Sequence, residues 1–474
     1  MQSIMINKIY LIIIFLSFCL TVSSQDIYNI ELEIEGYNGT EIIVAREFLN
    51  RYPVMDTLEV GPAGKFTFNG DSTLTAGVYL FVLPPDNDFL TFLVDKNDQN
   101  FTIKTQVSNL AGNVSVTNSP NNKLYYDHLN YSNNQVTKLN HINESIELSH
   151  TTERRAELTT AFTNELNALK TYREDLLKNN KGLFAANLIS LEMEKPIPAF
   201  KHLPKEHIPH AKFFYRKKHF FDLVDMRDNR LLYSEAMFNK VFYYLDELTS
   251  PNFDSLMVSI DDVLTLIKPA DQTFKYYLDH LMIEYASSDV IGMDEVYIYI
   301  VENYFGKGMA PWIPQEDLDE LLADALKRKP LLIGKLAPNI VMEKKDGTPI
   351  SLHEVESPYT ILYLWQPGCS HCKKSMPYLK DFYQKFKDKG VKIFSACTKV
   401  GSKTESCWEY IKENDMNEWI NAVDKDLSSR FVQKYLAEKT PKIYILDENK
   451  NIVLKDFGAD QLEEIMSDLL NQNR

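Results

Sequence analysis

The stretch "LWQPGCSHCKKSMP" (residues 364–377) places Cys369 and Cys372 three positions apart in a chain with only five cysteines. Four interpretations are open for this pair: a redox couple, half of a metal site, a structural bridge, or chance. The apolar run "YTILYLW" precedes the pair, and a segment with helical spacing follows it. Cys369 is therefore expected where a strand ends and a helix begins.

A helix start favours the thiolate form of Cys369. The thiolate faces the positive end of the helix dipole and the unpaired amides of the first turn. His371, Lys373 and Lys374 add positive charge nearby. The C-x-x-C spacing also lets Cys372 attack a mixed disulfide formed at Cys369, which is the second step of thiol–disulfide exchange.

A metal site and a structural bridge fit the pair less well. A zinc site needs about four ligands, usually from two such pairs, whereas Cys397 and Cys407 lie ten positions apart in different predicted elements. We therefore predict no metal and no organic cofactor. A purely structural bridge within C-x-x-C would be strained and reducible. A redox couple is the favoured interpretation.

Cys397 and Cys407 leave two alternatives open. A disulfide between them would close a loop of about ten residues and stabilise the fold by roughly 2–3 kcal/mol. Two buried free thiols are the other alternative. No sequence motif supports a further interpretation, in which Cys397 and Cys407 form a second redox relay.

The elements around the pair predict an α/β domain over residues 331–474. A short hairpin turning at Asp346-Gly347 comes first, and the strand and helix around the cysteines follow. Further along come the strand "VKIFSAC", two helices, the hairpin "PKIYILDENKNIVL" and a last helix. This order indicates helices packed around one central sheet. Pro330 and Gly334 mark the boundary.

Two other regions precede this domain. Residues 25–118 contain short β-rich runs, and Ile30, Leu32 and Ile34 alternate inward, which indicates a small β-sandwich. Residues 119–330 predict an all-α domain. Its signals are a stripe of Leu158, Phe162, Leu166 and Leu169, a second stripe before Pro330, and aromatic residues across 212–233 that we expect in the core. His219 is interpreted as a helix residue rather than a metal ligand.

The N-terminus and the overall charge limit the function. Lys8, the apolar run Ile9–Leu20 and small residues after it predict a signal peptide over 1–24. Lipoprotein processing at Cys19 fits less well because bulky Phe18 precedes it, and a retained anchor is a further alternative. No later segment is long and apolar enough to cross a membrane.

The 474 residues suggest roughly three domains, and the formal net charge of −15 argues against sequence-independent nucleic-acid binding.

The segments "LYLWQPGCSHCKKSMPYLKDFYQKF", "VKIFSAC" and "KTPKIYILDENKNIV" together resemble the thioredoxin-fold domain of TlpA/ResA-type bacterial extracytoplasmic thiol–disulfide oxidoreductases. The regions before it resemble multidomain members from the Bacteroides group. The resemblance implies that Cys369 is the exposed nucleophile and Cys372 the resolving thiol. It also implies that Pro441 is a cis proline packed against them and that Thr440 bonds a bound substrate chain. Trp365, His371 and Lys373 are expected to tune the pair.

Two positions depart from the family. Ser375 stands where many relatives carry a glutamate, and Tyr363 stands where thioredoxin has a buried aspartate. No carboxylate that would deprotonate Cys372 can be identified. A histidine before the second cysteine, here His371, also occurs in disulfide isomerases and makes the couple more oxidising.

The sequence therefore predicts an exported thiol–disulfide oxidoreductase of the periplasm or cell envelope of a Gram-negative bacterium. The favoured activity is reduction of exported proteins with disulfides, which requires a membrane-borne electron donor. The alternatives are a disulfide isomerase and a cell-envelope binding protein with a minor redox role. A peroxidase on the same fold is disfavoured, because Gln366 stands where a threonine is expected. The sequence does not indicate the oligomeric state.

Overall fold

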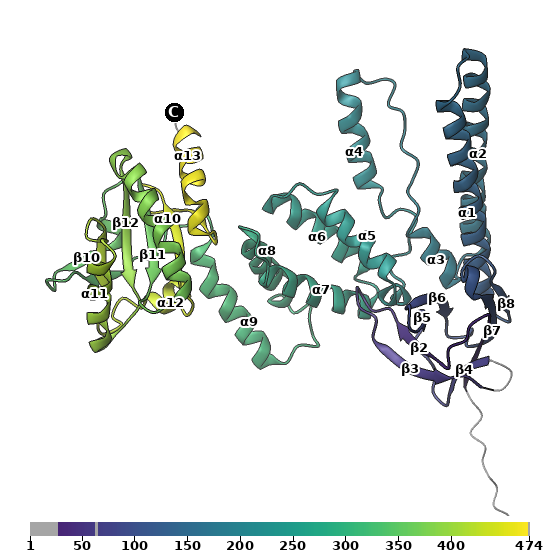
Figure 1. The fold of residues 1–474 in the computed structure, drawn as a ribbon, viewed down its shortest axis with the longest axis horizontal. Helices are drawn as coiled ribbons and strands as arrows, with labels where there is room; N and C mark the ends of the chain where they lie inside the picture. The colour runs from purple at the N-terminus through teal and green to yellow at the C-terminus, as the bar shows by residue number, and fades with distance from the viewer. Residues whose placement is uncertain (1–26, 62–64, 473–474) are drawn as a thin grey trace, which may run out of the picture. The chain divides into compact units, whose positions relative to one another are not determined.

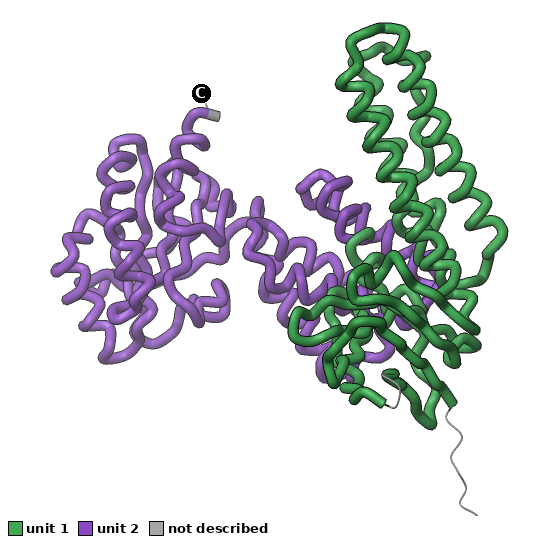
Figure 2. Tube along the Cα trace, turned by 45° about the vertical axis from the view of Figure 1, so that its right-hand side comes forward, with its two compact units in different colours: residues 1–225, 230–240 green, residues 226–229, 241–474 purple. Residues whose placement is uncertain are grey.

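The computed structural model describes residues 27–61 and 65–472. The chain divides into two compact units, a first unit of residues 1–225 and 230–240 and a second unit of residues 226–229 and 241–474 (Figure 2). The predicted signal peptide, residues 1–24, lies outside the described residues. The boundaries of the three predicted domains stay predictions.

The first unit begins with eight strands in two sheets (Figure 1). One sheet has the order β4-β1-β7-β8, with β1 (Tyr28–Glu35), β4 (Lys65–Gly70), β7 (Asn100–Gln106) and β8 (Ser115–Thr117). The other has the order β3-β2-β5-β6, with β2 (Glu41–Arg46), β3 (Val54–Glu59), β5 (Gly77–Leu83) and β6 (Asp88–Val94). Ile30, Leu32 and Ile34 of β1 are buried in one hydrophobic cluster with Phe81 and Phe92 of the second sheet. The predicted inward face of β1 is confirmed.

Helices follow the strands in the first unit. They are α1 (Pro120–Glu147), α2 (Thr152–Asn179), α3 (Phe184–Ser190) and α4 (Ile208–Lys218), and α5 (Glu235–Asp246) begins there. Ser119 and Thr151 cap α1 and α2, because each side chain accepts a hydrogen bond from a backbone N–H of the first turn. The helical middle of the chain is thus confirmed in its coarse form.

Two side-chain predictions in these helices are wrong. Leu169 of the predicted stripe is buried, but Leu166 is exposed. The aromatic segment also divides, since Phe220 is buried whereas Phe213 and Phe214 are exposed. The two exposed aromatics lie in α4, which buries none of its side chains, whereas Phe220 follows the end of that helix.

The second unit contains α6 (Phe253–Ile267), α7 (Asp271–Ala286), α8 (Met293–Ile300) and α9 (Gln315–Arg328). Helix α9 ends two residues before Pro330, where the sequence predicts its end. No helix among the described residues is long and apolar enough to span a bilayer.

A seven-stranded sheet follows, with the order β10-β9-β13-β12-β11-β14-β15. Its strands are β9 (Val341–Glu343), β10 (Pro349–Ser351), β11 (Tyr359–Trp365), β12 (Val391–Cys397), β13 (Ile420–Val423), β14 (Lys442–Leu446) and β15 (Ile452–Lys455). Strands β11, β12 and β13 are parallel; β14 is antiparallel to β11, and β15 is antiparallel to β14. The predicted hairpin at Asp346-Gly347 joins β9 to β10. Strand β13, which lies between the two helices expected after β12, was not predicted from the sequence.

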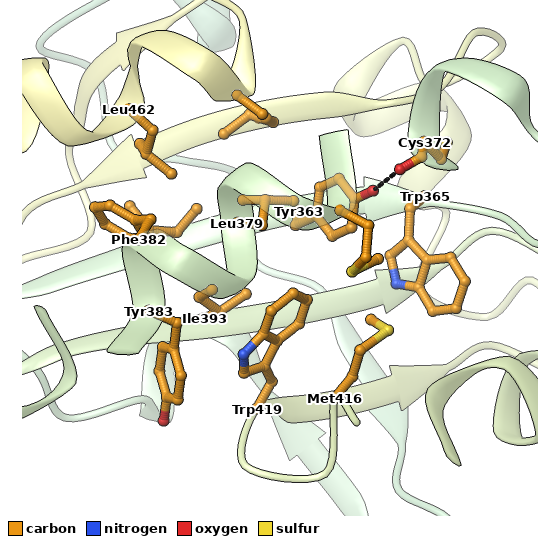
Figure 3. Packing of buried hydrophobic residues seen from close by; sticks show 14 of the residues in the cluster. Tyr363, Trp365, Cys372, Leu379, Phe382, Tyr383, Ile393, Met416, Trp419 and Leu462 are labelled. Atoms are coloured by element: carbon orange, nitrogen blue, oxygen red, sulfur yellow. Dashed lines mark hydrogen bonds between the residues drawn. The ribbon is translucent and has the colours of Figure 1, made fainter. Parts of the chain in front are cut away.

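Helices cover both faces of this sheet. They are α10 (Ser370–Phe386), α11 (Glu405–Glu413), α12 (Phe431–Tyr435) and α13 (Leu462–Gln472). Strand β11 is buried at every position, because its alternate side chains enter two different hydrophobic clusters. The cluster against α10 includes Tyr363, Trp365, Leu379 and Phe382 (Figure 3). The predicted α/β architecture of this region is confirmed.

Candidate active site

Cys369 lies at the N-terminus of α10, where the sequence predicts it. Gly368 has a φ of +80°, a conformation that favours glycine, and it turns the chain from β11 into the helix. The Cys369 Sγ accepts a hydrogen bond from the Cys372 backbone N–H at 3.1 Å. The Cys369 thiol donates to the Thr440 carbonyl oxygen at 3.3 Å. The site therefore joins two segments 71 residues apart in sequence.

Cys369 is half-buried, and its thiol is more acidic than usual. Burial raises the pKa of Cys369, but hydrogen bonds from Cys372, the Thr440 side chain and the His371 backbone lower it more, so the net shift is downward. Stabilisation of the thiolate by such hydrogen bonds is a general route to a reactive cysteine. Cys369 is thus both reachable and poised as a nucleophile.

Cys372 has the opposite environment. It is 1% exposed. Burial, and then the hydrogen bond with the Cys369 side chain, raise its pKa to about 12. Both cysteines are free thiols in the structure. The pair therefore consists of one accessible, acidic thiol and one buried thiol that holds its proton.

The peptide bond between Thr440 and Pro441 is cis, and the Thr440 carbonyl oxygen accepts the hydrogen bond from Cys369. This places both predicted residues beside the cysteine pair, immediately before β14. Their role in binding a substrate chain stays a prediction.

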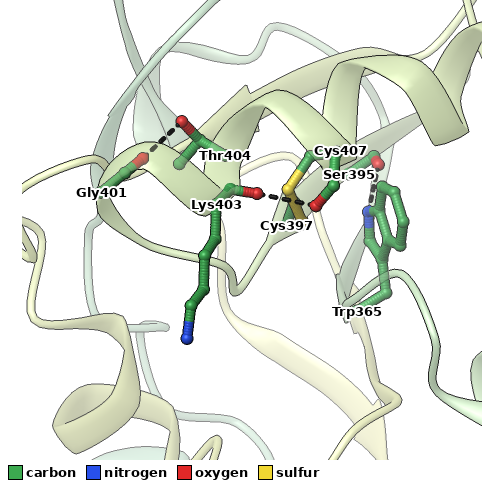
Figure 4. Close-up of a disulfide and its surroundings, with 8 residues drawn as sticks. Trp365, Ser395, Cys397, Gly401, Lys403, Thr404 and Cys407 are labelled. Carbon is green, nitrogen blue, oxygen red and sulfur yellow. Dashed lines mark hydrogen bonds between the residues drawn. A yellow bond between two sulfur atoms is a disulfide. The ribbon is translucent and has the colours of Figure 1, made fainter.

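The three predicted tuning residues lie in different environments. Trp365 is fully buried, and its Nε1 donates to Ser395 Oγ at 2.7 Å, which links β11 to β12 (Figure 4). The side chains of His371 and Lys373 are exposed. The interaction of His371 that lowers the Cys369 pKa runs through its backbone, and water screens exposed charges strongly. A tuning role for these side chains stays a prediction.

Two tyrosines near the cysteine pair were not among the site residues predicted from the sequence. The Tyr363 hydroxyl donates to the Cys372 carbonyl oxygen at 3.4 Å (Figure 3). Tyr410 of α11 packs its ring 5.1 Å from that of Trp365, and its pKa is raised by burial and then by the charges of Cys372 and Cys369. The sequence did give a signal for Tyr363, because this residue stands where thioredoxin has a buried aspartate. No spacing or motif in the sequence points to Tyr410.

Cys397 and Cys407 form a disulfide in the structure (Figure 4). Cys397 is the last residue of β12, Cys407 lies in α11, and both are fully buried. Of the two alternatives that the sequence left open, the structure has the disulfide. In the described part of the chain, no group of three or more His, Cys, Asp and Glu side chains could hold a metal ion.

The region that contains the cysteine pair is similar to known proteins. Residues 333–455 match the AhpC/TSA family. Residues 28–125 and 170–327 match two domains of unknown function, DUF4369 and DUF5106. The thiol-disulfide oxidoreductase ResA of Halalkalibacterium halodurans is 34% identical over 136 residues, which are 28% of this chain and 74% of that protein. ResA of Bacillus cereus is 28% identical over 139 residues, 29% of this chain and 77% of that protein.

Solved structures are similar as well. A domain of a possible thiol-disulfide isomerase from Cytophaga hutchinsonii is 33% identical, with a TM-score of 0.28, and covers 30% of this chain and 96% of that one. A thioredoxin-like protein from Bacteroides caccae is 21% identical, with a TM-score of 0.46, and covers 57% of this chain and 97% of that one. The family match spans the sheet, helix α10 and both cysteines of the pair. Through this region the chain belongs to the thioredoxin-like family of ResA/TlpA-type thiol–disulfide oxidoreductases.

Proposed function

We propose that this protein exchanges thiols and disulfides with exported proteins through Cys369 and Cys372. The observation that carries the proposal is the asymmetry of the pair. Cys369 is half-buried with a lowered pKa, and Cys372 is buried with a pKa raised to about 12. The first thiol can react with a client protein, and the second is held back until a mixed disulfide forms.

The exchange has two steps. The Cys369 thiolate attacks one sulfur of a client disulfide, a bond forms between them, and the other client sulfur leaves as a thiolate that takes a proton from water. Cys372 then loses its proton and attacks Cys369 Sγ. The bond between Cys369 and the client breaks, and the second client sulfur leaves and is protonated. The client gains two electrons, and the enzyme ends as the Cys369–Cys372 disulfide.

Reduction of clients is the proposed direction. A positive His371 side chain would make the couple more oxidising, but this side chain is exposed, where its charge is screened. The raised pKa of Cys372 also means that its thiolate is poorly stabilised, so a second negative charge adds little to the stability of the reduced pair. Continued turnover then requires an electron donor, and we propose a membrane-borne one. Disulfide isomerisation is the alternative direction.

The location and the finer architecture are part of the proposal. We assign residues 1–24 to a signal peptide, 25–118 to a β-sandwich, 119–330 to an all-α domain and 331–474 to the redox domain. The shared hydrophobic cluster of the two N-terminal sheets supports the sandwich. The resemblance to extracytoplasmic oxidoreductases supports a place in the periplasm or cell envelope.

The test is reduction of insulin by the full chain, with dithiothreitol as the electron source. We expect Cys369→Ser to lower the rate to that of dithiothreitol alone. Cys372→Ser, reduced beforehand and freed of dithiothreitol, should accumulate a mixed disulfide with insulin at Cys369. Ser375→Ala is the matched control, because Ser375 lies in the same helix and its hydroxyl bonds only the His371 carbonyl oxygen among the described contacts. Full activity of Cys369→Ser would refute the proposal and favour the binding-protein alternative.

A further inference from the structure

The resolving step poses a problem that the two cysteines do not solve. Cys372 must become a thiolate to attack Cys369, yet it is almost completely buried. The groups that affect its thiol most are Cys369, the Gln366 backbone and the Thr440 side chain, and no carboxylate is among them. Removing a buried proton without a nearby base requires some other stabilisation of the negative charge.

Tyr363 is held rigidly at this point. It lies in the centre of the sheet, where β11 pairs Tyr363 with Ser395 of β12 and with Ile443 of β14. Its side chain is fully buried. Its ring stacks 6.3 Å from that of Trp365 at 9° and meets that of Trp419 edge-on at 6.4 Å. A ring confined by two indoles has little freedom to move.

The hydroxyl of this fixed ring points to the first turn of α10. It lies 3.4 Å from the Cys372 carbonyl oxygen, to which it donates a hydrogen bond, so it reaches the residue that carries the resolving thiol. Burial, and then the charges of Cys372, Tyr410 and Cys369, raise the Tyr363 pKa far above neutral. The hydroxyl therefore keeps its proton at any working pH. It can donate a hydrogen bond, but it cannot accept the Cys372 proton as a carboxylate could.

We propose that Tyr363 is a positioning residue of the resolving step, whose hydroxyl donates to Cys372 Sγ as the thiolate forms. This inference rests on the proposed function. The proton of Cys372 passes to water, the thiolate attacks Cys369 Sγ, and the client thiolate that leaves takes a proton in return. Tyr363 stays neutral throughout. A phenol thus serves at the position of the buried thioredoxin aspartate, by stabilising the nucleophile instead of deprotonating it.

The titratable groups around Cys372 make this inference testable by pH. Cys369, Tyr363 and Tyr410 face it. In the mixed disulfide Cys369 no longer titrates, and both tyrosines stay protonated. The rate of the resolving step then follows the ionisation of Cys372 alone, so it rises with pH.

Ellman's reagent separates the two steps in the reduced full chain. Attack by Cys369 releases a first thionitrobenzoate in a phase that depends on reagent concentration, and attack by Cys372 releases a second in a phase that does not. We expect Tyr363→Phe to leave the first phase unchanged. The second phase should slow by about tenfold or more, because a hydrogen bond to a charged group contributes about 1.5–3 kcal/mol. Its pH midpoint should also move upward.

The matched control is Tyr444→Phe. Tyr444 is buried in β14, and its hydroxyl also donates to a backbone carbonyl, that of Tyr435, at 3.4 Å. It belongs to the hydrophobic cluster on the other face of the sheet. Loss of this hydroxyl should leave both phases unchanged, which separates a role at Cys372 from a general effect of removing a buried hydroxyl.

Each outcome has one meaning. Absence of the first phase in the wild type would refute the proposed function. Two normal phases in Tyr363→Phe would leave that function intact and overturn the role of Tyr363. If Tyr363→Phe does not fold, fluorotyrosine at position 363 replaces it, because it keeps the ring and makes the hydroxyl a stronger hydrogen-bond donor. The second phase should then be faster than in the wild type, and an unchanged second phase would overturn the role of Tyr363.

Discussion

Removal of the Cys397–Cys407 disulfide should destabilise the redox domain without stopping its chemistry. The bridge joins residues ten apart, and both sulfurs are fully buried. Opening a loop of this size in the unfolded chain costs about 2.7 kcal/mol of stability in the chain-entropy model. The melting temperature of a unit of this size falls by about 2–4 °C per kcal/mol, so Cys397→Ala/Cys407→Ala should melt about 5–11 °C lower.

Tryptophan fluorescence during thermal unfolding suits this measurement. Three of the four tryptophans, Trp365, Trp408 and Trp419, lie in this domain, and Trp408 follows Cys407 directly. Insulin reduction by the same variant, measured well below its melting temperature, should equal that of the wild type, because the buried bridge cannot reach a client.

Two results would refute this reasoning. An unchanged melting temperature would show that the bridge does not constrain the unfolded chain. A variant that stays folded but no longer reduces insulin would show that the second pair is a redox relay and not a structural bridge.

The titrating groups lead to three more expected outcomes. Thr440→Val removes a hydrogen bond that lowers the pKa of Cys369; the rate of Cys369 alkylation by iodoacetamide should then rise at higher pH than in the wild type, and an identical profile would contradict this. At pH 8, iodoacetamide should label Cys369 and spare Cys372, whose pKa is raised to about 12; mass spectrometry that finds equal labelling would refute the asymmetry of the pair. Burial, and then the charge of Arg173, lower the pKa of His128 from 6.5 to about 4, so the folded state favours neutral His128 and its contribution to stability is full above pH 6.5. Up to about 3 kcal/mol should be lost as the pH falls from 6.5 to 4, and calorimetry should show a flatter loss in His128→Phe; equal slopes would contradict the assignment.

The sequence predicts the redox domain well because its local signals agree with its tertiary structure. Strand β11 is apolar at nearly every position, and it is buried on both faces. Strand β13 was missed because its four residues, Ile420–Val423, carry a polar Asn421 and become a strand by pairing with β12 on one side and β9 on the other. Strand β3 also gives a weak signal in the sequence, since only Leu58 of its six residues is buried and no alternation marks it.

The residues of the active site also differ in how well the sequence predicts them. Cys369 and Cys372 are neighbours in sequence, so their spacing reveals them. Thr440 joins them from 71 residues away, and only the resemblance to a family pointed to it. Tyr410 reaches the site from α11, whose Cys407 is bonded to Cys397 of β12, and no motif encodes this contact. The spacing of Cys397 and Cys407 gives the size of their loop but not whether the two side chains face each other.

The most direct test of the proposed function is a redox titration of the full chain. The protein is equilibrated with glutathione buffers, its thiols are trapped, and the peptides that carry each cysteine are identified by mass spectrometry. We expect a reversible two-electron couple on Cys369 and Cys372, at about −250 mV or below if the protein is a reductase. A couple near −180 to −120 mV would reverse the proposed direction. A chain in which Cys369 and Cys372 stay reduced at every potential would contradict thiol–disulfide exchange as the function.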